Sequence, residues 1–100
     1  MRYNFKDSVG KEVTFIGIRS KIPWQHLIQF FSDRKHIDYL DLDNGEQIVI
    51  YSREPITCRA KMRITGELIV TKGKSKRLGA EENDTYIEYQ LLVDSWTCED

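Results

Sequence analysis

The chain has 100 residues, of which 40% are hydrophobic and 31% charged, and its formal net charge at pH 7 is −1. A chain of this length forms one domain and buries roughly two-thirds of the surface that its unfolded state exposes. The near-neutral charge excludes binding to nucleic acids or membranes through bulk positive charge, so an electrostatic site must be local. We expect residues 1–100 to form a single domain, which the abundant Val, Ile, Tyr and Thr residues predict to be rich in strands.

The N-terminal residues lack the apolar run of a signal peptide. No stretch of about 18 apolar residues, the length that a membrane span requires, occurs in the sequence. The sequence therefore predicts a cytoplasmic protein without a membrane segment.

The first strand is predicted over Val13–Ser20, with Gly17 in its middle. A glycine inside a strand usually marks a bend, a bulge or the close approach of another backbone. We expect Gly17 to be the point where this strand bends to serve two sides of a barrel.

The next stretch, residues 21–32, has two interpretations. Pro23 suits the first turn of a helix, whose apolar face would consist of Leu27, Phe30 and Phe31. Alternatively, Trp24, His26 and Ile28 alternate along an extended segment, and this second interpretation is favoured. Trp24 and Trp96 are expected in the core or at the closure of the barrel.

A tight hairpin is predicted between strands over residues 37–42 and 47–51. The turn Asp43-Asn44-Gly45 has the residue types that adopt the positive φ values of such turns. Alternation predicts four residues facing the core: Leu40, Leu42, Ile48 and Ile50. It predicts four on the outer face: Tyr39, Asp41, Val49 and Tyr51.

Two further strands are predicted over residues 62–70 and 86–96. They are separated by a polar loop, residues 71–85, which is longer than most loops of compact domains. The connection 52–60 before the fourth strand contains Pro55, which argues against a continuous ladder there.

These strands resemble a known fold through Phe15–Ile18, Tyr39–Glu46, Ile48–Tyr51 and, above all, Met62–Ile69, an alternating strand with a central glycine. A glycine-bent first strand, a tight second hairpin and a long loop between strands four and five resemble the OB-fold, a five-stranded Greek-key barrel. The resemblance implies an all-β, antiparallel barrel with a binding role, since OB-folds bind oligonucleotides, oligosaccharides and proteins. Many OB-folds have a helix between strands three and four, so here we expect residues 24–31 to close the barrel instead.

The resemblance implies that the long loop flanks the binding face. Flexible cations on it would follow the phosphates of a single strand, while aromatic rings would stack on its bases. The candidate cations are Arg63, Lys72, Lys74, Lys76 and Arg77. The candidate stacking rings are Tyr39, Tyr51 and Tyr89. The alternative is that the loop is merely solvated, because acidic residues follow its basic half.

Acidic residues in the second strand and its turn oppose nucleic-acid binding there, because carboxylates repel phosphates. They are Asp38, Asp41, Asp43 and Glu46. The run is too short for a calcium loop, and hairpin solubility explains it better. The alternative to nucleic acid is a protein partner or a second copy bound by the face of Tyr39, Val49 and Tyr51, whose other role is cross-strand stabilisation.

The two cysteines have positions that suggest a pair. If Val70 lies opposite Tyr86, the same register puts Cys58 opposite Cys98, because 58 and 98 have the same sum as 70 and 86. Opposed residues lie within disulfide range. Two reduced thiols are nevertheless favoured, because cytoplasmic proteins normally keep their thiols reduced.

Motifs for catalysis or cofactor binding are absent from the sequence. It has no close pair of metal ligands, no phosphate-binding glycine loop and no nucleophile elbow. We therefore expect a non-catalytic binding module without a cofactor or metal. Single-stranded nucleic acid is the preferred ligand, and protein interaction or homo-oligomeric assembly through the strand 2–3 face is the alternative.

Overall fold

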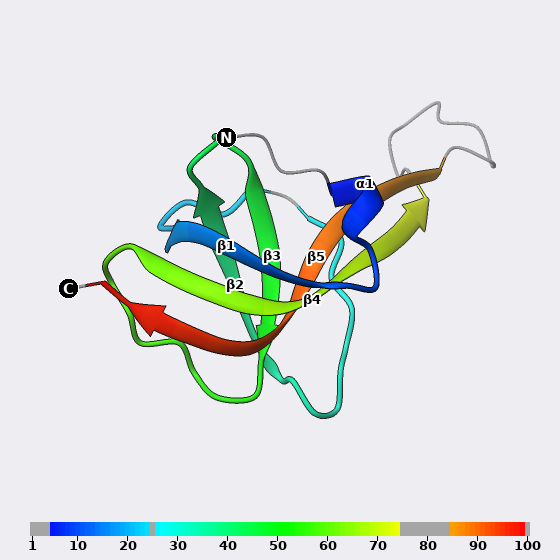
Figure 1. Cartoon of the computed structure of the whole chain (residues 1–100). Coiled ribbons are helices and arrows are strands. Elements are labelled where there is room, and N and C mark those ends of the chain that lie inside the picture. The colour runs from blue at the N-terminus through cyan, green and yellow to red at the C-terminus, as the bar shows by residue number, and fades with distance from the viewer. Residues whose placement is uncertain (1–4, 25, 75–84, 100) are drawn as a thin grey trace.

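The computed structural model describes residues 5–24, 26–74 and 85–99, which form a closed five-stranded barrel preceded by a short helix (Figure 1). The helix α1 is Phe5–Ser8. The strands are β1 (Glu12–Arg19), β2 (His36–Leu42), β3 (Gln47–Ser52), β4 (Met62–Lys74) and β5 (Thr85–Cys98). The predicted all-β barrel class is confirmed.

The barrel closes in the order β1-β2-β3-β5-β4, and β4 returns to β1. Four of the strand contacts are antiparallel. The contact between β3 and β5 is parallel and consists of two residue pairs, Ile50 with Leu91 and Tyr51 with Leu92. The barrel is therefore mixed, and its shortest backbone contact lies between β3 and β5.

Gly17 is the residue at which β1 changes partner. Residues 12–17 pair with β4, and residues 17–19 pair with β2. A Cβ at Gly17 would lie 2.4 Å from the backbone oxygen of Asp41, so a side chain would prevent this close approach. The expectation that Gly17 serves two sides of the barrel is confirmed.

The hairpin between β2 and β3 also forms as predicted. Gly45 has a φ of 89° and is the only described residue of the turn with a positive φ. The amide of Leu42 donates to the carbonyl of Glu46 at 2.8 Å, and the amide of Gly45 donates to the carbonyl of Leu42 at 3.0 Å. Glycine supplies the left-handed conformation that this turn needs.

Apolar side chains fill the barrel. The four core residues predicted on β2 and β3 are all buried. The rest of the core comes mainly from Phe15, Ile56, Met62, Ile64, Leu68, Leu91 and Val93. Phe5 of α1 packs on this core, with its ring centroid 5.6 Å from that of Phe15 and 5.5 Å from that of Tyr89. The helix therefore contributes an aromatic ring to the barrel.

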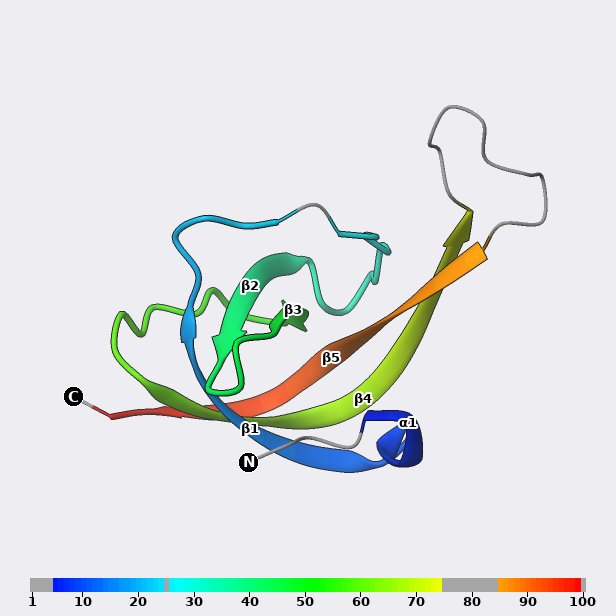
Figure 2. The same ribbon diagram turned by 90° about the horizontal axis from the view of Figure 1, so that it is seen from above.

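Strands β4 and β5 continue past the barrel as a two-stranded ribbon (Figure 2). Thr71–Lys74 was predicted to belong to a loop, but it is the end of β4. The predicted pairing of Val70 with Tyr86 is also wrong, because Val70 lies opposite Tyr89. The strands extend further than the apolar pattern indicates, and a bulge between Thr65 and Gly66 shifts their register.

The described residues between β1 and β2 do not form the alternative helix, and they join no strand of the barrel. Residues 26–31 instead lie over the outer surface of β3, β4 and β5, where they contact Tyr51, Thr71 and Gln90. We call these six residues the cover segment.

Candidate functional site

The predicted aromatic face on β2 and β3 is largely closed to solvent. Val49 and Tyr51 point outward, as their alternation predicts, but both are 0% exposed. The cover segment lies over Tyr51, and its Phe31 ring meets the Tyr51 ring edge-on with centroids 4.8 Å apart. The expected exposure of this face is therefore wrong at Val49 and Tyr51, and Tyr51 presents no ring surface to a base.

A buried hydrogen-bond network holds the cover segment on the barrel. The side-chain oxygen of Gln90 accepts from the hydroxyls of Tyr51 at 2.6 Å and Thr71 at 2.7 Å. Its Nε2 donates to the carbonyl of Leu27. The backbone amide of Gln29 donates to the Tyr51 hydroxyl at 2.9 Å. Among the described residues, no buried side-chain nitrogen or oxygen lacks a partner, so the network is fully satisfied.

His26, the first residue of the cover segment, is anchored by contacts with two strands. Its Nδ1 contacts a carboxylate oxygen of Glu88, and its Nε2 lies 2.8 Å from the side-chain oxygen of Gln47. The other oxygen of Glu88 accepts from the backbone amide of Leu27 at 2.9 Å. The imidazole also lies 5.6 Å from the ring of Tyr39, which remains partly exposed. Tyr39 thus retains some accessible surface beside His26.

The other predicted stacking ring, Tyr89, lies on the core side of β5. Its ring packs against Phe5 of α1, and both rings contact the buried cluster inside the barrel. Tyr39, Tyr51 and Tyr89 therefore do not form one stacking surface.

The predicted cations also do not form one cluster in the described part of the chain. Arg63 and Lys72 are exposed on β4 and lie nine positions apart, which is about 30 Å along a strand. Lys74 is the last residue of β4. Lys76 and Arg77 lie outside the described residues.

A groove lies between the end of β1 with the residues that follow it and the turn between β2 and β3. Its volume is about 590 Å³. Its apolar lining includes Ile18, Ile22 and Trp24, which are 45%, 76% and 57% exposed. Asp41 and Asp43 line its other side. We call it the Trp24 groove. The expected burial of Trp24 is wrong, whereas Trp96 packs against the core as expected.

Gln47, at the start of β3, holds both walls of the Trp24 groove. Its side-chain oxygen accepts from the backbone amide of Trp24 at 2.6 Å. Its amide nitrogen donates to Asp41 Oδ1 at 2.8 Å, Ser20 Oγ at 2.9 Å and the carbonyl of Ile22 at 3.3 Å. A single side chain therefore fixes the path of the backbone that presents Trp24. No sequence pattern revealed this role, because Gln47 lies more than 20 positions along the chain from Ser20, Ile22 and Trp24.

A second hollow, of about 480 Å³, shares residues 19–21 of its lining with the Trp24 groove. It is lined by Arg19, Ser20, Lys21, Cys58 and Arg59, and we call it the basic pocket. Of its three cations, Arg19 is the last residue of β1, Lys21 follows that strand, and Arg59 belongs to the connection between β3 and β4.

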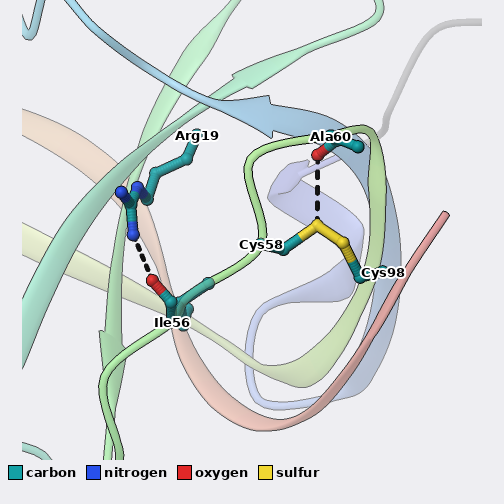
Figure 3. Close-up of a disulfide and its surroundings, with 5 residues drawn as sticks. All are labelled: Arg19, Ile56, Cys58, Ala60 and Cys98. Atoms are coloured by element: carbon teal, nitrogen blue, oxygen red, sulfur yellow. Dashed lines mark hydrogen bonds between the residues drawn. A yellow bond between two sulfur atoms is a disulfide. The ribbon is translucent and has the colours of Figure 1, made fainter. Parts of the chain in front are cut away.

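Arg19 is the best anchored of the three cations. It donates to the carbonyl of Ile56 (Figure 3), and its Nε lies 3.9 Å from a carboxylate oxygen of Asp38. Burial raises the pKa of Asp38, although its electrostatic interactions with Arg19 and His36 act in the opposite direction. Asp38 and Arg19 thus lie next to each other in a partly buried site.

Cys58 and Cys98 form a disulfide, with their Cα atoms 5.6 Å apart (Figure 3). The prediction of two reduced thiols is therefore wrong. The register that suggested the pair is wrong, because Cys98 lies opposite Met62 and Cys58 precedes β4. The connection curls back so that Cys58 reaches the end of β5, and the bridge fixes the backbone next to Arg59.

Among the described residues, no group of three or more His, Cys, Asp or Glu side chains is placed to hold a metal ion. The helix found in this part of the chain is too short and too polar to cross a membrane. Comparisons with protein-family models, with curated proteins and with solved structures gave no match.

Proposed function

We propose that this chain is a non-catalytic binding module, built on an OB-like barrel, whose Trp24 groove binds an extended segment of a partner protein. The strand order β1-β2-β3-β5-β4 is compatible with an OB-like fold. The observation that carries the proposal is the exposed apolar wall of Ile18, Ile22 and Trp24 beside a groove. Contiguous exposed apolar side chains mark interaction sites, and tryptophan is enriched among the residues that dominate binding energy.

The groove is fixed before any ligand arrives. Gln47 links the backbone of Trp24 to Ser20 and Asp41. Ordering flexible segments opposes binding, so walls that are already ordered favour it. An extended peptide suits this groove, because its lining combines exposed apolar side chains with polar groups such as Asp41 and Asp43.

Selection from a displayed library of random linear peptides tests the proposal. We expect the chain to enrich peptides with aromatic or branched apolar residues, and Trp24→Ala to lose most of their binding. Phe30→Ala is the matched control, because Phe30 is 80% exposed and does not line the groove. Failure to enrich any peptide, or equal loss in both variants, would contradict the proposal. Concentration-dependent light scattering that disappears in Trp24→Ala would identify a second copy as the occupant.

Single-stranded nucleic acid is a second candidate ligand of the same face. The exposed indole of Trp24 lies on the segment that also carries Lys21, and Arg59 lines the adjoining pocket. An exposed ring beside cations suits stacking on bases and contact with phosphates. If Arg19, Lys21 and Arg59 all contact phosphates, the logarithm of the affinity would fall with that of salt with a slope of about −2. Fluorescence anisotropy with labelled oligonucleotides measures this slope, and no binding at low salt would exclude this candidate.

A further inference from the structure

We infer that the basic pocket binds a carboxylate side chain of the partner, so that the Trp24 groove takes an acidic peptide segment that also carries an apolar anchor. This inference rests on the proposed function, because the pocket and the groove share residues 19–21. The apolar side chain would lie beside Trp24, and the carboxylate would lie among the cations of the pocket.

Two cations of the basic pocket are available to a ligand. Lys21 and Arg59 are exposed, and neither forms an ion pair with another described residue. Together with Arg19 they line one hollow of about 480 Å³. Like charges near each other repel, and a bound anion would relieve that repulsion.

The carboxylate next to Arg19 does not neutralise the pocket. Asp38 lies 3.9 Å from Arg19, so three positive charges and one negative charge leave a surplus of two. Arg19 also donates to the carbonyl of Ile56 (Figure 3), which restrains its guanidinium. The surplus charge therefore belongs mainly to Lys21 and Arg59.

The disulfide holds the backbone that carries Arg59. Cys58 lines the pocket and is bonded to Cys98 at the end of β5. Its Sγ lies 3.3 Å from the carbonyl oxygen of Ala60, so residues 58–60 follow a compact path (Figure 3). The pocket is consequently held on the β1 side by Arg19 and on the other side by a covalent bond.

The charges along the whole face favour a peptide over a nucleic acid. Asp41 and Asp43 line the Trp24 groove, and a continuous phosphate chain passing along it would meet their negative charge. A peptide can place a carboxylate in one hollow and an uncharged apolar side chain in the other. An extended peptide rises about 3.3 Å per residue, so residues one or two positions apart can reach neighbouring hollows.

Titration with three synthetic peptides, followed by NMR of the isotope-labelled chain, tests the inference. The first peptide is Glu-Glu-Leu-Phe-Glu-Glu with blocked ends. The second has lysine at each glutamate position, and the third has serine in place of leucine and phenylalanine. We expect the first to shift amide resonances of both hollows and to bind about tenfold more tightly than the second, with a preference that decreases as salt is added.

Charge reversal at the pocket provides the second measurement. Arg59→Glu and Lys21→Glu should each lower the affinity for the acidic peptide several-fold and raise that for the basic peptide. Lys6→Glu is the matched control, because Lys6 is exposed on α1, which precedes the other end of β1. It should change neither affinity beyond the effect of the net charge.

The outcomes separate the inference from the proposed function. If both apolar peptides bind equally well and shift only the resonances of the groove, the inference is overturned and the proposed function stands. If neither apolar peptide binds at millimolar concentration, both are overturned. Binding of the acidic serine peptide as tight as that of the first peptide would also overturn the inference, because it would show that no apolar anchor is used.

Discussion

The hydroxyl of Tyr51 donates a hydrogen bond of 2.6 Å to the side-chain oxygen of Gln90, and both side chains are fully buried. This bond joins β3 to β5, whose backbones pair at only two positions. The same Tyr51 hydroxyl accepts from the amide of Gln29 in the cover segment. One phenol therefore supports both the parallel contact of the barrel and the chain that lies over it.

Tyr51→Phe tests this double role. The change leaves the amide of Gln29 without its acceptor and removes one of two donors to Gln90, and we expect a loss of about 1–3 kcal/mol in the free energy of unfolding. Urea unfolding measures the loss. Tyr39→Phe is the control and should change stability by less than about 0.5 kcal/mol, because Tyr39 is partly exposed. Equal effects of the two variants would contradict the role of Tyr51.

The same residue predicts a pH dependence. Burial raises the pKa of Tyr51 above its ordinary value of 10.0; the amide of Gln29 opposes this rise, whereas Glu88 and Tyr39 add to it. Above pH 10 the unfolded chain releases this proton first, so stability should fall as pH rises from 10 towards the folded pKa. Urea unfolding at alkaline pH should show a smaller decline for Tyr51→Phe than for the unmodified chain. An identical decline would contradict the prediction.

Two glycines of β4 should differ in their tolerance of a methyl group. A Cβ at Gly66 would lie 2.0 Å from the backbone oxygen of Leu92, whereas a Cβ at Gly73 would lie 2.5 Å from the terminal Cδ2 of Leu27. Backbone cannot yield as a leucine side chain can, so we expect losses of about 3 kcal/mol for Gly66→Ala and about 1 kcal/mol for Gly73→Ala. Thermal unfolding ranks the two variants, and the reverse order would contradict the packing described here.

The disulfide should dominate the stability of the chain. A bridge between residues 40 positions apart contributes about 4 kcal/mol in the chain-entropy treatment. For a domain of this size, reduction should then lower the melting temperature by roughly 15–30 °C. The Cys58→Ser, Cys98→Ser double variant should melt at the lower temperature and show no response to reductant. A stable bridge is typical of oxidising compartments rather than of the cytoplasm that the sequence predicts.

The strands could be predicted because their signals are local. Alternation places Leu40 and Ile48 in the core, Gly45 marks the hairpin, and Gly17 marks the change of partner in β1. The C-terminal end of β4 was harder to predict, because Thr71–Lys74 is polar and is held in a strand by pairing with β5. The strand propensity of these residues does not include the stabilisation that pairing with β5 provides.

The site was harder to predict because distant residues create it. Hydrogen bonds between Leu27 and the side chains of Glu88 and Gln90 set the path of the cover segment. The cover segment in turn buries Tyr51. Gln47 in turn presents Trp24 at the surface. None of these partners is near in sequence, so propensity and periodicity could assign neither the covered face nor the exposed groove.

The bridge between Cys58 and Cys98 turns the second half of the chain into a covalent ring that contains β4 and β5. A protease that cuts once between these cysteines would open the ring without releasing a fragment. The product would keep the mass of the whole chain plus one water and would separate into two pieces only after reduction. Strands β4 and β5 would also stay tethered near each other after such a cut, so a nicked molecule could keep its barrel.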